Sequence, residues 1–131
     1  MAEVRVVGIR VEQPQNQPVL LLRESNGDRY LPIWIGQSEA AAIALEQQGV
    51  EPARPLTHDL FKDTLETLGV QLDRVVVTEL RETTFYAELH LTSMGDTFVV
   101  SSRPSDAVAL AARTDCPIFV MEDVLAEAGV V

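Results

Sequence analysis

The chain has 131 residues, of which 47% are hydrophobic and 23% charged, with 20 acidic against 10 basic side chains. This length favours one globular domain with a single core. The net charge of −10 argues against a broad basic surface of the kind that binds nucleic acid nonspecifically, although it leaves room for a local basic cleft.

The first three predicted strands form a meander. Residues 4–11 alternate between apolar and polar side chains, but the phase slips at Val6, just before Gly8, which predicts a β-bulge. Residues 19–23 are a continuous apolar run, typical of a strand buried on both faces. Residues 30–35 form the third strand, and the proline within it predicts either a position at the edge of the sheet or a bulge at that point.

Two helices are predicted after this meander. Ser38 is the expected N-cap of an alanine-rich helix, with Glu39 in its first turn, and Gly49 is expected to end it. Thr57 is the expected N-cap of a second helix that ends at Gly69. Its apolar side chains recur on one face, which indicates an amphipathic helix.

The second half of the chain repeats the order of the first. Its predicted elements are strands around 75–77, over 85–92 and over 97–101, a helix that begins at Ser105, a strand over 117–120 and a helix over 123–128.

An internal duplication explains this repetition. The alanine-rich segments 38–45 and 105–112 share a serine, an acid and a run of small residues in register. The predicted repeat units cover about residues 4–48 and 72–113 of a single domain. The predicted fold class is therefore α+β: a duplicated unit of β-meander plus alanine-rich helix, with the helices packed on a mainly antiparallel sheet.

The apolar phases also predict the core and the sheet edges. An open meander leaves unpaired backbone, so we expect a homo-oligomer, most simply a dimer. Trp34 is expected in the core. The residues predicted to be largely buried are Val7, Ile9, Leu21, Ile33, Ile43, Leu65, Val76, Leu89, Val99, Leu110 and Val120.

The cysteine content, the N-terminal pattern and the lengths of the apolar runs predict a cytoplasmic protein. Cys116 is the only cysteine and cannot form an internal disulfide. The N-terminus enters a strand pattern directly, without the layout of a signal peptide, and no apolar run approaches the ~20 residues that span a bilayer. His90 alternates with Glu88 on the polar face of a strand and is expected to be solvated.

Two polar clusters are candidates for chemistry. His58 beside Asp59, at a helix start, could act as a general acid or base or as a metal ligand, or could serve the helix start alone. Arg103 could hold a phosphate while Asp106 binds a metal or a base, although capping by Ser105 and its neighbour explains the same residues. Glu39 is the counterpart of the second acid and shares both interpretations.

Four segments, covering residues 18–23, 29–36, 54–60 and 103–107, resemble motifs of the bifunctional nuclease domain family. The resemblance runs over nearly the whole chain, in the expected order. It implies a nuclease that hydrolyses phosphodiester bonds of DNA and RNA. The polar positions that match the family motifs are Glu39, Arg54, Thr57, His58, Asp59, Arg103, Ser105 and Asp106.

On this resemblance, water would be activated by His58 or by a divalent metal, Mg²⁺ or Mn²⁺, with Asp59, Asp106 and Glu39 as the catalytic carboxylates. The expected substrate contacts are Arg54, Arg103, Ser105 and Thr57. We expect five of these residues to cluster around one pocket, which would support the nuclease interpretation: Arg54, His58, Asp59, Arg103 and Asp106.

Two other classes of function remain open. The same cleft could belong to a regulatory or ligand-binding module without turnover. Alternatively, the apolar edge at residues 32–35 could mediate self-association in a structural protein.

Overall fold

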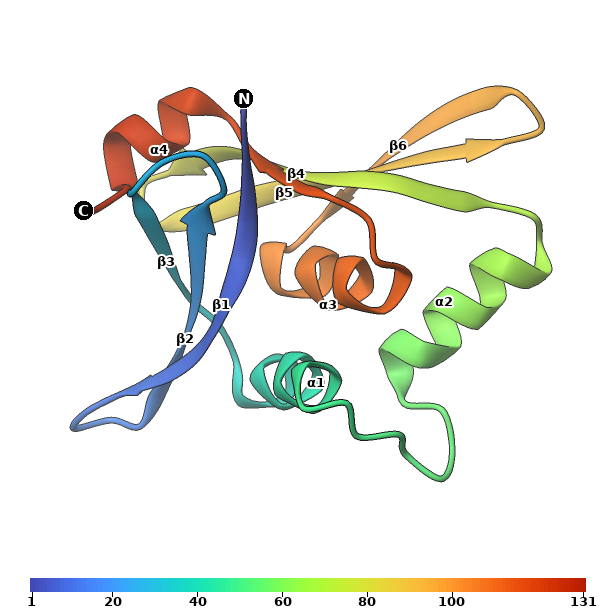
Figure 1. The fold of residues 1–131 in the computed structure, drawn as a ribbon, viewed down its shortest axis with the longest axis horizontal. Helices are drawn as coiled ribbons and strands as arrows, with labels where there is room; N and C mark the ends of the chain where they lie inside the picture. The colour runs from blue at the N-terminus through green and yellow to red at the C-terminus, as the bar shows by residue number, and fades with distance from the viewer.

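Eleven elements make up the protein, shown in Figure 1 as a computed structural model that describes residues 1–131. In chain order they are β1 (Ala2–Glu12), β2 (Gln17–Glu24), β3 (Tyr30–Trp34), α1 (Gln37–Gln47), α2 (Thr57–Thr67), β4 (Gln71–Arg81), β5 (Thr84–Ser93), β6 (Asp96–Ser102), α3 (Pro104–Thr114), β7 (Ile118–Val120) and α4 (Glu122–Ala128). The strands form one sheet, in the order β3-β2-β1-β7-β4-β5-β6. Every neighbouring pair is antiparallel except β4 with β7, so the predicted α+β class is confirmed.

The first meander, β1 to β3, follows the sequence pattern closely. The register between β1 and β2 shifts between Val6 and Gly8, which confirms the predicted bulge. Strand β2 is buried from Pro18 to Leu22, as a continuous apolar run predicts. Strand β3 lies at the edge of the sheet with Pro32 inside it, where the missing proline N–H costs little.

The second meander, β4 to β6, occupies the other half of the sheet. Between the two halves lies β7, which is antiparallel to β1 and parallel to β4. The first strands of the two meanders therefore run in opposite directions, as expected for two units related by a two-fold rotation. Each meander leads to an alanine-rich helix, α1 or α3, in the order that the sequence predicts.

Helix α3 is the centre of the structure. The sheet turns around it, with β1 on one side and β4 above it in Figure 1, while α1 lies alongside it. Its alanines at 107, 109 and 111 are all buried, because small side chains allow backbones to approach closely. Helix α2 packs against α3 and β4, and α4 packs against β3 and β4. None of the four helices has the length and hydrophobicity needed to span a membrane.

The three predicted N-caps are wrong by one or two residues. Helix α1 begins at Gln37 with Gly36 as its N-cap, so Ser38 lies inside the helix, and Ser105 likewise lies inside α3. Helix α3 starts earlier because proline at 104 is well suited to the first helical position. Thr57 is the first residue of α2, and the N-cap is Leu56.

Most of the predicted core is buried, but three positions are corrected. Val7 is exposed because it is the extra residue of the β1 bulge, without a partner in β2. Val99 is exposed because it lies on β6, opposite His90 and on the face away from the helices. Trp34, at the end of edge strand β3, is also exposed. Of the remaining predicted core residues, Leu21, Ile33, Ile43, Val76, Leu89, Leu110 and Val120 are buried, whereas Ile9 and Leu65 are half-buried.

Candidate functional site

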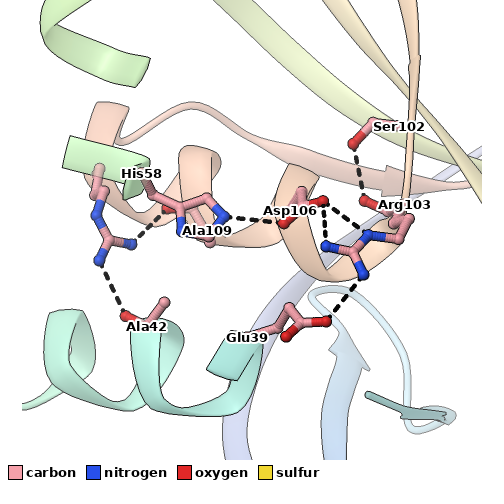
Figure 2. A network of polar contacts seen from close by, with 8 residues as sticks. Glu39, Ala42, His58, Ser102, Arg103, Asp106 and Ala109 are labelled. Carbon is pink, nitrogen blue, oxygen red and sulfur yellow. Dashed lines mark hydrogen bonds and ion pairs between the residues drawn. The ribbon is translucent and has the colours of Figure 1, made fainter. Parts of the chain in front are cut away.

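The acidic residues of the two repeated helices meet at one arginine. Arg103 directly precedes α3, and its guanidinium donates to Asp106 at 2.9 Å and to Glu39 of α1 at 3.0 Å. Figure 2 shows the guanidinium between the two carboxylates, which belong to different helices. The corresponding acids of the two units therefore lie at one place.

Glu39 is held there by the start of its own helix. Its carboxylate folds back over Gly36, where a Cβ would come within 2.9 Å of a carboxylate oxygen. A Cβ at position 36 would push this flexible carboxylate aside. The extended backbone of Gly36 then leads directly into the first turn of α1, so the turn after β3 fixes where this acid lies.

Helix α2 brings a histidine to the same cluster. The Nε2 atom of His58 lies 3.0 Å from Oδ1 of Asp106, and the histidine side chain is only 13% exposed. The residues are 48 positions apart in the sequence and belong to α2 and α3. His58, Asp106, Arg103 and Glu39 therefore form one chain of polar contacts (Figure 2).

Electrostatic interactions favour the ionised forms of Asp106 and Arg103, at the centre of these polar contacts. Burial raises the pKa of Asp106, but the hydrogen bonds from His58 and Arg103 outweigh it and hold the pKa below its usual value. Hydrogen bonding to Asp106, with Glu39 adding its charge, raises the pKa of Arg103. With a neutral imidazole, two carboxylates and one guanidinium leave the cluster with one net negative charge.

A cavity of about 640 Å³ opens beside the polar chain. His58, Asp106, Arg103 and Glu39 line one part of it. Half of its sixteen lining residues are hydrophobic, among them Phe61 from α2. The space is large enough for a nucleotide-sized ligand, with charged groups at one end and apolar walls elsewhere.

The other predicted site residues lie at different places. Thr57 lines the same cavity, whereas Ser105 is buried and faces a separate hollow next to β3. Arg54 is exposed, makes no hydrogen bond or ion pair, and does not line the cavity. Asp59 points away from the polar chain, towards Arg113.

Arg113 is a buried side chain beside the site whose contacts the sequence analysis missed. Its side chain is 3% exposed, and its guanidinium donates to Asp59 at 2.8 Å and to the carbonyl oxygens of Ala42 and Ala109. One cation thus joins α1, α2 and α3. The backbone N–H of Leu56, with Arg113 adding, holds the pKa of Asp59 below its usual value despite partial burial. Asp59 therefore positions α2, and with it the adjacent histidine.

Arg103 occupies the carboxylate oxygens of the site that a divalent metal would use. No three of the chain's His, Cys, Asp and Glu residues gather closely enough to hold an ion. Arg103 already places its positive charge between Glu39 and Asp106, where a metal would need free carboxylate oxygens. In this arrangement the groups available for chemistry are the side chains themselves.

Comparison with known proteins gives two groups of relatives. A protein of Mycobacterium tuberculosis named only as uncharacterized is 68% identical over 129 residues, which is 98% of this chain and 77% of the relative. Bifunctional nuclease 2 of Arabidopsis thaliana is 31% identical, over 82% of this chain and 33% of the plant protein. Bifunctional nuclease 2 of Oryza sativa subsp. japonica is 28% identical, over 86% of this chain and 36% of the plant protein.

The sequence profile of the bifunctional nuclease domain matches residues 20–131. This range begins in β2 and includes His58, Arg103 and Asp106. The match covers about one third of the length of each plant relative, so the shared part is one domain of the longer plant proteins. The chain belongs to the bifunctional nuclease domain family.

Proposed function

We propose that this protein is a nuclease that hydrolyses phosphodiester bonds of DNA and RNA. The observation that carries the proposal is the contact between His58 and Asp106 at the wall of a nucleotide-sized cavity, next to an exposed arginine. Its family contains plant proteins named bifunctional nucleases, which supports the same class of reaction.

His58 is the proposed general base and acid. When Nε2 carries the ring proton and donates it to Asp106, Nδ1 carries the lone pair that can accept a proton from water. The ionised carboxylate then stabilises the imidazolium that forms. The same imidazolium can return its proton to the leaving oxygen, as the second half of hydrolysis requires.

Arg103 is the proposed phosphate contact. Its side chain is 65% exposed and lines the cavity, so a phosphate can reach it. Its guanidinium is shared by Glu39 and Asp106, and a bound phosphate would have to displace one of them. Because Asp106 also contacts His58 whereas Glu39 contacts only the arginine, we expect Glu39 to release the arginine while Asp106 keeps the histidine in place. The hydroxyl group of Thr57, which lines the same cavity, is a further substrate contact in this proposal.

The chain offers a matched control, because it contains only two histidines, His58 and His90. We expect the purified protein to cleave fluorescent single-stranded DNA and RNA. His58→Gln should lower kcat/KM by about 100-fold or more, as removal of a general base does, whereas His90→Gln should leave it unchanged. Cleavage that persists in His58→Gln would show that another site or a contaminant is responsible.

The same assay tests the role of metal. Side-chain chemistry predicts that cleavage continues in the presence of a chelator and gains little from Mg²⁺ or Mn²⁺. Cleavage that occurs only with added metal would contradict the roles given to His58 and Arg103, while leaving the nuclease class intact.

The cavity walls favour one second candidate, a ligand-binding module without turnover. The hydrophobic lining, including Phe61 and Val100, resembles a small-molecule pocket more than an exposed groove for a polyanion. In that case mononucleotides would raise the melting temperature, Phe61→Glu would remove the effect, and no cleavage would be seen. The nuclease and the module are thus distinguished by turnover.

The proposed place of action is the cytoplasm. The only cysteine, Cys116, is half-buried and has no second cysteine to pair with, which suits a reducing compartment in which no disulfide is needed. Fractionation of cells that produce the protein would test this.

A further inference from the structure

The outer edge of the sheet at β6 is exposed along its length. Every residue from Asp96 to Ser101 is exposed, and no strand pairs with β6 beyond β5. Three consecutive apolar side chains lie in the middle of this strand: Phe98 is 51% exposed, Val99 56% and Val100 46%. Unpaired backbone beside apolar side chains is a template for another strand.

These side chains divide between the two faces of the sheet. Phe98 lies opposite Leu91 and Val100 lies opposite Leu89, both of which belong to the core under the helices. Val99 lies opposite His90 and therefore on the other face. An occupant that paired with β6 would cover apolar side chains on both faces at once.

The opposite edge strand of the sheet, β3, is less available than β6 for pairing with another strand. In β3 the side chains of Leu31 and Ile33 are buried, and Pro32 interrupts the row of backbone donors. Tyr30 also pairs with Val130 near the end of the chain. Strand β6 contains neither proline nor lysine, the residues that commonly prevent pairing at a sheet edge.

We propose that the occupant is a second copy of this chain, whose β6 pairs antiparallel with β6 about a two-fold axis at Val99. The strand is self-complementary in this register, because Val99 is the middle of its seven residues. Phe98 of one subunit would lie opposite Val100 of the other, an aromatic and β-branched pair on the helix side of the sheet.

The charge distribution leaves β6 as a place where two copies can meet. Each chain carries a net charge of −10, so two copies repel each other over most of their surfaces. Strand β6 carries a single charge, Asp96 at its start, and the two-fold register places that residue opposite Ser102 rather than opposite its own copy. The centre of the interface is therefore uncharged, and the two acids lie at opposite ends.

Pairing would also extend the wall of the cavity. Val100 lines the cavity described above, together with Phe61 of α2. The partner's Phe98 would pack beside Val100 and cover apolar surface that is exposed in one chain alone. This inference does not depend on the proposed catalytic activity.

The mass of the full chain in solution tests the proposal. Analytical ultracentrifugation should give a dimer at micromolar concentration. Val99→Lys should raise its dissociation constant by about 100-fold or more, because two lysines would face each other at the axis. Val11→Lys is the matched control, since Val11 is exposed to a similar extent on β1, and it should leave the dimer unchanged. A monomer, or a dimer that Val99→Lys does not weaken, overturns the proposal.

Crosslinking tests the register itself. Directly opposed residues of antiparallel strands have Cα atoms about 4.5–5.5 Å apart, which a disulfide can bridge. In a Cys116→Ser background, Val99→Cys should form a covalent dimer on mild oxidation, whereas Val11→Cys should not. Efficient crosslinking by Trp34→Cys instead would assign the interface to β3 and overturn the proposal.

Discussion

The two edge strands, β3 and β6, end equivalent meanders but have opposite environments. In β3 the side chains of Leu31 and Ile33 are buried under the helices, and α4 packs alongside. In β6 the residues at the corresponding places in the meander are exposed on both faces. The first unit has thus completed its core within one chain, whereas the second has not.

The exposed strand β6 leads directly into the candidate functional site. The chain leaves β6 through Ser102 and enters Arg103, whose guanidinium joins the two carboxylates of the site. The exposed edge strand β6 is therefore followed directly by the charged cluster of Arg103, Glu39 and Asp106. At the end of β6, Val100, Ser101 and Ser102 line the cavity.

The largest expected effect tests whether β3 carries the core. Leu31→Ala removes a fully buried side chain and should lower the free energy of unfolding by about 3–5 kcal/mol. Val99→Ala, the matched change in β6, should cost less than about 0.5 kcal/mol in the monomer. Urea denaturation at a protein concentration below that of dimerisation measures both. Equal losses would show that the two edges are equally packed.

The second effect concerns the junction between the units. Arg113→Met leaves Asp59 without its cation and leaves two carbonyl oxygens, of Ala42 and Ala109, without a donor. We expect a loss of about 2–3 kcal/mol, since the guanidinium is almost completely buried.

The control for this change is Arg81→Met, which removes an exposed ion pair with Glu79 and a cation–π contact with Tyr86. It should change the free energy of unfolding by about 1 kcal/mol or less. If Arg113→Met were equally harmless, the three helices would be held by apolar packing alone, and Asp59 would have no positioning role.

How much the sequence could predict depends on how local each cause is. The bulge at Val6 and the edge position of Pro32 follow from neighbouring residues, and both are confirmed. The exposure of Val99 could not be predicted, because it depends on which face of the sheet the helices pack against.

The site shows the same limit. The repeated serine-acid-alanine pattern led to Glu39 and Asp106, because a duplication carries equivalent residues to equivalent places. The pairing of Asp59 with Arg113 joins positions 54 residues apart, through the way α2 packs on α3. A basic residue in the last turn of α3 was the only available signal, and helix-dipole compensation explains such a residue equally well.

The smallest expected effect is a dependence of stability on acid pH. The pKa values of Asp59 and Asp106 are lowered in the folded chain relative to the value of about 3.9 for an unperturbed aspartate. Between the folded and unfolded values, the unfolded chain binds more protons than the folded one. The stabilisation is therefore fully present above about pH 4 and is lost as the pH falls through the folded values.

Urea midpoints measured at pH 7, pH 4 and pH 3 should detect this loss. Asp59→Asn removes the titrating group, so the difference in stability between wild type and variant should shrink as the pH falls below about 4. Asp63→Asn, an exposed position on the same helix, should show no such convergence. A difference that stays constant down to pH 3 would mean that Asp59 acts through its shape and hydrogen bonds rather than its charge, and that α2 is held in place by Arg113 without an ion pair.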